Sequence, residues 1–253
     1  MNTTKGSPHG TNRKTAIIVG VLFIIGTVSG VLSGVVTAPI RAGSTFPLNI
    51  SASETQWIIG TLFVMLMGLS LAMMPVLLYP IFRKHNQVLA LGAVLFRGAI
   101  EAISYAIMVI SMLLLVTVSE LYGKTGAADA SNLQALGSVL VASRDWTEMW
   151  GALVFNIGAL MVYALFYQTR FVPRWLSAWG FIGGALSVVA NLASMFGPLH
   201  IAPDIGSGIG LLMIPIAIQE MFFAVWLIVK GFNSSAVASL SAKTAANELL
   251  SAA

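Results

Sequence analysis

Cysteine is absent from the 253-residue chain, and charged residues are scarce. The lack of cysteine excludes a disulfide scaffold, Cys-ligated zinc, iron–sulfur clusters and thiol nucleophiles. Thirteen Lys and Arg plus nine Asp and Glu make up only 9% of the residues, whereas soluble domains carry about 25%. Hydrophobic residues account for 57% of the chain and the mean hydropathy is +0.89. The composition therefore predicts a membrane protein, because a chain with so few polar residues cannot supply the polar surface that a soluble protein of this size needs.

The sequence contains several long hydrophobic runs with few charged residues. A membrane-spanning helix needs about 20 apolar residues, and runs of this length without alternation favour helices over barrel strands. Six runs qualify: Thr15–Thr37, Trp57–Phe82, Val88–Val118, Trp146–Tyr167, Trp175–Phe196 and Ile209–Val229. The first exceeds the apolar region of a signal peptide, about 7–15 residues, so we interpret it as an uncleaved anchor. The predicted fold is an all-α bundle of six transmembrane helices.

Residues at the ends of the runs indicate where the helices begin. Ser51 to Glu54 forms a capping-box pattern before the second span, and Asp145 to Glu148 resembles the start of the fourth. The six tryptophans lie near predicted ends, as in an aromatic belt: Trp57, Trp146 and Trp150 at one interface, and Trp175, Trp179 and Trp226 at the other.

The basic residues predict the orientation. Nine lie on one side of the predicted bundle, at the N-terminus, in two short loops and after the sixth span, whereas three lie on the other side: Arg41, Lys124 and Arg144. Cytoplasmic loops carry the excess of Lys and Arg. We therefore expect both termini in the cytoplasm. The basic isoelectric point then reflects topology and does not indicate a nucleic-acid partner.

The segments between the spans suggest one membrane domain with a short segment at each terminus. We expect a flexible cytoplasmic N-terminus over residues 1–14, a six-helix domain over 15–232 and a cytoplasmic C-terminal tail over 233–253. The largest external loop is predicted to hold a short surface helix at Leu133–Val141. Pro75 and Pro215 predict kinks. Glycines spaced four apart, at positions 26, 30 and 34 and at 180 and 184, predict close packing between helices of the same chain.

Three ionisable residues lie deep in predicted hydrocarbon: Arg97 and Glu101 on the third span and Glu220 on the sixth. A charge at the bilayer centre costs roughly 2.5–3.5 kcal/mol on insertion scales, so these residues should face the interior and be paired. Arg97, Glu101 and Tyr105 are four residues apart and share a helix face. Counted from the same membrane side at 1.5 Å per residue, Arg97 lies about 20 Å and Glu220 about 15 Å deep. We predict a buried Arg97–Glu101–Glu220 cluster that joins these two spans.

This cluster has two interpretations, and the sequence leaves both open. Fully ionised, it would carry a net charge of −1, so we expect one Glu to be protonated or to bind a cation, a proton or a basic ligand group. Asn156, Asn191 and Gln219 are further intramembrane polar groups that could extend the network. In the functional interpretation, the cluster is a ligand or proton site. In the structural one, it is a latch that only determines which helices pair.

Other candidate sites are weak. The three histidines, His9, His85 and His200, lie outside the spans, with His85 predicted cytoplasmic and His200 external, so these two cannot together hold a haem or catalytic zinc. Met108 and Met112 have the spacing of a thioether pair but are expected to pack as apolar side chains. Asp145 and Glu148 are expected to cap a helix rather than to bind lipid headgroups. We predict no cofactor and no metal site, and find no catalytic constellation.

Three segments together resemble a family of bacterial multi-pass membrane proteins catalogued as domain of unknown function 4386. The segments are 89–102, which contains Phe96-Arg97-Gly98, then 171–180, which contains Pro173-Arg174-Trp175, and 215–231, which contains Glu220 and ends in Lys230-Gly231. The resemblance covers about residues 15 to 232. It implies an inner-membrane location and a six-helix bundle, and it implies no activity, substrate or catalytic residue.

The sequence thus predicts a membrane protein whose partners are the lipid bilayer and a small-molecule or lipid ligand. The first hypothesis is a carrier or binding protein with the Arg97 cluster as its polar centre. The second is a non-catalytic membrane scaffold or partner protein in which the cluster specifies packing. A membrane enzyme is the least supported, because no nucleophile–base set is found. The oligomeric state does not follow from the sequence.

Overall fold

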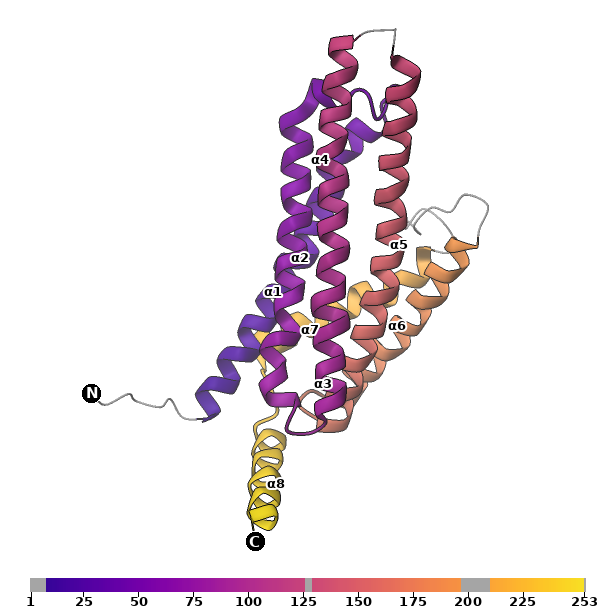
Figure 1. The fold of residues 1–253 in the computed structure, drawn as a ribbon. Helices are drawn as coiled ribbons and strands as arrows, with labels where there is room; N and C mark the ends of the chain where they lie inside the picture. Colours follow the sequence, from indigo (N-terminus) through magenta and orange to yellow (C-terminus); the bar gives the residue numbers. More distant parts are fainter. Residues whose placement is uncertain (1–7, 126–128, 197–209, 253) are drawn as a thin grey trace, which may run out of the picture.

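The computed structural model describes residues 8–125, 129–196 and 210–252, and within these ranges the chain is almost entirely helical and contains no strand (Figure 1). Six helical stretches in the described ranges are long and apolar enough to cross a membrane: Asn12–Arg41, Ile50–Phe82, Gln87–Thr125, Ala130–Thr169, Arg174–Met195 and Leu211–Val229. The predicted all-α architecture with six apolar helices is therefore confirmed.

Helices α1 (Pro8–Arg41) and α2 (Glu54–Phe82) form the first pair. Gly26 and Gly30 of α1 lie against Leu71 and Met67 of α2, where an added Cβ would come within 2.7 Å of either side chain. The predicted close packing is thus found at two positions of the α1 strip, whereas Gly34 has open space beside it.

The predicted capping box before α2 is wrong. Residues Ile50–Ser53 form a short 3₁₀ helix, η1, and Ser53 makes no side-chain capping bond. The backbone N–H of Ser51 instead donates to the Ser119 hydroxyl at 2.8 Å. The hydroxyl of Ser119, which is distant in the sequence, thus takes the place of the local side-chain cap that the pattern predicted.

The third span is continuous but changes its winding in the middle. It begins as α3 (Gln87–Ala93), whose N-terminus is capped by the Asn86 side chain, and ends as α4 (Glu101–Thr125). Between them, Val94–Ile100 form a π-helical segment, η2, that contains Arg97. Such wide turns are rare and are frequent at functional sites.

Helix α5 (Ala130–Thr169) is 40 residues long and packs against α4. It corrects two predictions, because Leu133–Val141 is no separate surface helix and the fourth span does not begin at Asp145. No proline interrupts this stretch, and Gly137 lets the helix pass Pro47, so the backbone hydrogen bonds continue without a break. Asp145 and Glu148 therefore lie in mid-helix and do not cap it.

Helices α6 (Arg174–Met195) and α7 (Ile214–Val229) are shorter and cover only the lower part of the bundle in Figure 1, where α4 and α5 rise beyond them. Pro215 lies in the first turn of α7, directly after the 3₁₀ segment η4 (Gly210–Met213), where the missing N–H of proline is tolerated. His200 and most of the glycine-rich segment 206–210 lie outside the described residues.

Helix α8 (Ser234–Ala252) follows at the end of the bundle where α1 begins, which we call the terminal end (Figure 1). The C-terminal tail is helical, in keeping with its many alanines, which have the highest helix propensity. The opposite end, where α4 ends and α5 begins, is called the far end.

The helices are held together by an apolar core rich in phenylalanine. Phe82, Phe166, Phe171 and Phe223 are buried, and Phe166 contacts both Phe82 and Phe223 edge to face at about 4.9 Å between ring centroids. The predicted apolar packing of Met108 and Met112 is confirmed, as both are buried in a second cluster. Trp57 is fully buried there too, with its Nε1 donating to the Met112 carbonyl, so its predicted place in an interfacial belt is wrong.

Candidate functional site

Arg97 is the centre of a buried group of charges. Its side chain is 3% exposed, and its guanidinium contacts Glu101 through Nη1 at 2.5 Å and Glu220 through Nη2 at 3.2 Å. The hydroxyl of Tyr105 donates to Glu101 Oε1 at 3.2 Å. The structure thus brings together the three residues of the predicted cluster and Tyr105, and Arg97 connects the third and sixth spans.

Close helix packing holds Arg97 in place. At Gly158 of α5, an added Cβ would lie 2.5 Å from the Arg97 backbone nitrogen, so only glycine allows α5 and η2 to approach this closely. The Phe155 ring, three residues earlier, lies 4.2 Å from the guanidinium carbon, which is within the range of a cation–π interaction. A second ring, Phe23 of α1, lies 6.0 Å away.

The two carboxylates differ in surroundings. The Glu101 side chain is 2% exposed, and its Oε2 atom has no hydrogen-bond partner. The Glu220 side chain is 14% exposed and makes one bond of 3.2 Å to Arg97. Because Glu220 is the less enclosed and the less strongly bonded of the two, it is the member of the cluster that an incoming group can reach.

A groove of about 650 Å³ leads from the far end of the bundle to this cluster. Helices α1 and α5 supply its sides, and Val64, Met67 and Met108 of α2 and α4 line it between them. Arg97, Tyr105, Phe155 and Glu220 line its inner part. From Arg144 at the mouth to Phe155, α5 rises about 16 Å at 1.5 Å per residue. Polar side chains occur along this path: Ser33, Thr37, Ser104 and Thr147.

The mouth of the groove carries a second group of charges. Arg144 contacts Asp145 at 2.8 Å and Glu148 at 3.3 Å, and Arg41 at the end of α1 lies across from them on the groove lining. Asp145 and Glu148 therefore serve as ion-pair partners of Arg144 instead of the helix caps that the sequence suggested. With two cations and two carboxylates, the mouth is formally neutral.

The interior beyond the cluster holds a much smaller space. On the terminal-end side of Arg97, a void of about 10 Å³ is bounded by Met74, Leu78 and Tyr163. Such a volume holds about one water molecule. Phe23 and Phe223 pack edge to face next to it, with 5.7 Å between their ring centroids. The groove thus opens toward the far end and stops at the cluster.

Comparison with known proteins identifies the family. A family model described as a domain of unknown function (DUF4386) matches residues 18–231. The chain belongs to this family. No curated protein and no solved structure matched it. Membership of DUF4386, together with the six apolar helices, makes the chain a multi-pass membrane protein.

The three residues predicted to extend the cluster of this DUF4386 protein lie in other networks. Asn156 donates to Ser187 of α6 at 3.0 Å, and Gln219 accepts from Tyr163 and donates to the Leu176 carbonyl. Gln219 is one residue from Glu220, so its side chain projects about 100° around the helix and faces α6 rather than Arg97. Asn191 likewise bonds to Ser187. These residues join α5, α6 and α7 behind the cluster.

The sequence did not reveal the aromatic contact of Phe155, the π-helical turn at Arg97 or the groove itself. Phe155 is one apolar residue among many on a long helix, and nothing in its spacing singles it out. Among the described residues, no group of three or more His, Asp or Glu side chains is arranged to hold a metal ion. His85 contacts Gln168 at 2.9 Å at the terminal end and makes no contact with the cluster residues that the structure describes.

Proposed function

We propose that this membrane protein binds or carries a small or amphipathic ligand in the groove between α1 and α5, with Arg97, Glu101 and Glu220 as the polar centre. One observation carries the proposal: a groove of about 650 Å³ ends at Arg97 and Glu220, where a purely structural ion pair would be packed against side chains on every side. Ligand pockets in proteins have volumes of about 300–1,000 Å³, mostly apolar walls and a few polar groups.

The charge of the cluster suggests the ligand class. One Arg and two Glu leave one negative charge without a counter-charge when both carboxylates are ionised, and Glu220 faces the groove. A ligand with a basic head and an apolar body satisfies both features: the head binds at Glu220 and the body lies along Val64, Met67 and Met108. A proton on Glu220 would replace that head when the groove holds no ligand.

We further propose that the protein lies in a bacterial inner membrane with both termini in the cytoplasm. The support is the excess of Lys and Arg at the terminal end, nine against three at the far end. In this orientation, the groove opens on the outer side of the membrane and the aromatic core closes the cytoplasmic side.

The second candidate function is a scaffold or partner protein in which the cluster is a latch. The observation that favours it is the complete pairing of Arg97, whose guanidinium contacts both carboxylates and a phenyl ring. Such a latch requires no ligand, and its removal affects only the packing of η2 against α7.

One experiment separates the two candidates. The full chain in nanodiscs is titrated with octylammonium, octanol and octanoate, which share one chain and differ in the charge of the head. The ligand site predicts that octylammonium binds best and that Glu220→Gln abolishes this preference while the protein still folds. The latch predicts no preference among the three probes. Glu120→Gln, at a surface carboxylate outside the groove, is the matched control and should keep the preference for the cation.

A further inference from the structure

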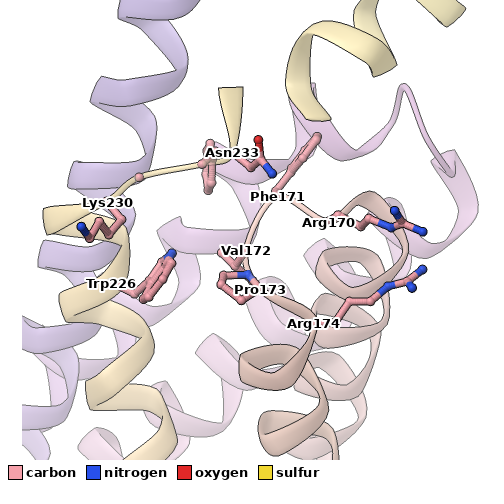
Figure 2. A pocket seen from close by; sticks show the side chains of 10 residues that line it. Arg170, Phe171, Val172, Pro173, Arg174, Trp226, Lys230 and Asn233 are labelled. Atoms are coloured by element: carbon pink, nitrogen blue, oxygen red, sulfur yellow. The ribbon is translucent and has the colours of Figure 1, made fainter. Parts of the chain in front are cut away.

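A second cavity, of about 460 Å³, lies at the terminal end, between the α5–α6 turn and the connection from α7 to α8. Figure 2 shows Trp226 and Lys230 on α7 along one wall, with Pro173, Arg170 and Arg174 across from them. The turn is shaped by Arg170, which has a φ of 58° and ends α5 in the left-handed conformation. No acidic residue lines this cavity.

The basic residues here lack acidic partners. Arg170, Arg174 and Lys230 are exposed, and none of them forms an ion pair with any residue that the structure describes. Arg174 lies over the Tyr167 ring at 5.0 Å, a cation–π contact that provides no acidic partner. By contrast, the guanidinium of Arg13 donates hydrogen bonds to the last carbonyls of α7. The rim of the cavity therefore carries three cations without an acidic partner in the described part of the chain. Lys230 lies on the α7 side, and the side chains of Arg170 and Arg174 lie on the opposite side and point away from it (Figure 2).

An apolar groove of about 790 Å³ continues from this cavity along the outer face of α7. The two share Trp226 and Lys230, and the groove extends over Phe222, Ile218 and Ala217. From Val229 to Ala217 the helix rises about 18 Å, comparable to the roughly 15 Å that one leaflet contributes to the hydrocarbon core. Only Thr27 lines both this groove and the one that ends at Arg97.

We infer that the two cavities together form a binding site for an anionic phospholipid. The phosphate lies at the basic rim beside Lys230, the indole of Trp226 lies at the level of the glycerol, and an acyl chain lies along α7. Each part matches one part of the lipid: basic pockets between helices recognise anionic headgroups, and tryptophan prefers the interface between headgroups and hydrocarbon. The site is separate from the ligand groove proposed above and does not depend on it.

The test is native mass spectrometry of the full chain with phosphatidylglycerol and phosphatidylcholine. The site predicts that phosphatidylglycerol is retained preferentially and that Lys230→Gln weakens its binding about fivefold, the effect of losing about 1 kcal/mol for one basic residue. Lys84→Gln is the matched control, because Lys84 is an exposed cation at the same end outside both cavities. It should leave the binding unchanged.

Three results would overturn the inference. An equal loss in Lys84→Gln would indicate diffuse attraction to the basic end rather than a site. Displacement of the lipid by inorganic phosphate at millimolar concentration would indicate a site for a free anion. Unchanged lipid binding in Val225→Trp, which narrows the apolar groove away from the cations, would show that no acyl chain lies there. Melting curves of each variant confirm that it is folded.

Discussion

The guanidinium of Arg97 lies 3.2 Å from the carboxylate of Glu220, a residue 123 positions further along the chain. This contact joins the π-helical turn of the third span to the sixth span and positions both groups at the inner end of the groove. The same contact can hold helices together and bind a ligand. Its effect on stability and its effect on ligand binding can be measured separately.

Removal of Arg97 alone should destabilise the protein strongly. Arg97→Met leaves Glu101 and Glu220 buried without their cation, and loss of one partner of a buried ion pair typically costs about 3–5 kcal/mol. Unfolding of the purified protein measures the loss. Arg97→Met combined with Glu101→Gln should recover part of it, because fewer unpaired charges remain. Arg83→Met, at an exposed arginine, should change stability little; a similar loss there would contradict the special role of Arg97.

The approach of α5 to Arg97 depends on Gly158. Gly158→Ala places a methyl group 2.5 Å from the Arg97 backbone nitrogen, and overpacking of this kind costs about 1–3 kcal/mol. The control is Gly34→Ala, which meets open space and should be neutral or stabilising, since alanine favours a helix over glycine by about 0.5–1 kcal/mol. Equal melting temperatures for the two variants would show that α5 does not pack on η2 as described.

The open space beside Gly34 offers a way to fill the groove without disturbing the core. Gly34→Leu should reduce octylammonium binding at least about tenfold, which corresponds to about 1.4 kcal/mol, while the melting temperature stays near that of the parent. Gly123→Leu is the matched control, since Gly123 also has open space beside it but does not line the groove. Unchanged binding in Gly34→Leu would place the ligand elsewhere.

Arg13 holds the last turn of α7. Its guanidinium donates to the carbonyls of Leu227, Ile228 and Val229 at 2.7–3.1 Å, which satisfies groups that a helix end leaves unpaired. Arg13→Gln should therefore speed hydrogen exchange of the backbone amides at the end of α7. Lys14→Gln, at the neighbouring exposed residue, should not. Equal exchange in both variants would show that the end of α7 is stable without Arg13.

The sequence predicted the six spans and the Arg97–Glu101–Glu220 cluster because both follow from the cost of placing polar groups in hydrocarbon. A charge that cannot face lipid must find a partner, and few partners are available in so apolar a chain. The same reasoning failed for Asn156 and Gln219, whose amides are satisfied by Ser187 and Tyr163. A small neutral group can pair with any nearby polar atom, so burial cost alone does not determine its partner.

The remaining features depend on tertiary packing. The capping box at Ser51 and the helix start at Asp145 are local patterns that the fold does not use, because Ser119 pairs with Ser51 and α5 begins fifteen residues before Asp145. The groove results from the separation of α1 and α5, which is set by helices that are distant in the sequence. No pattern within one span encodes that separation.

The most direct test of the account uses the absence of cysteine from the chain. Ser104 and Ser187 are both buried, but Ser104 lines the groove next to the cluster and Ser187 does not. Ser104→Cys and Ser187→Cys are treated in nanodiscs with a charged, water-soluble methanethiosulfonate reagent. The account predicts that Ser104→Cys is modified, that octylammonium slows its modification, and that Ser187→Cys stays unreactive. Equal protection of both cysteines would mean that water does not reach Arg97 and that the cluster is only a latch.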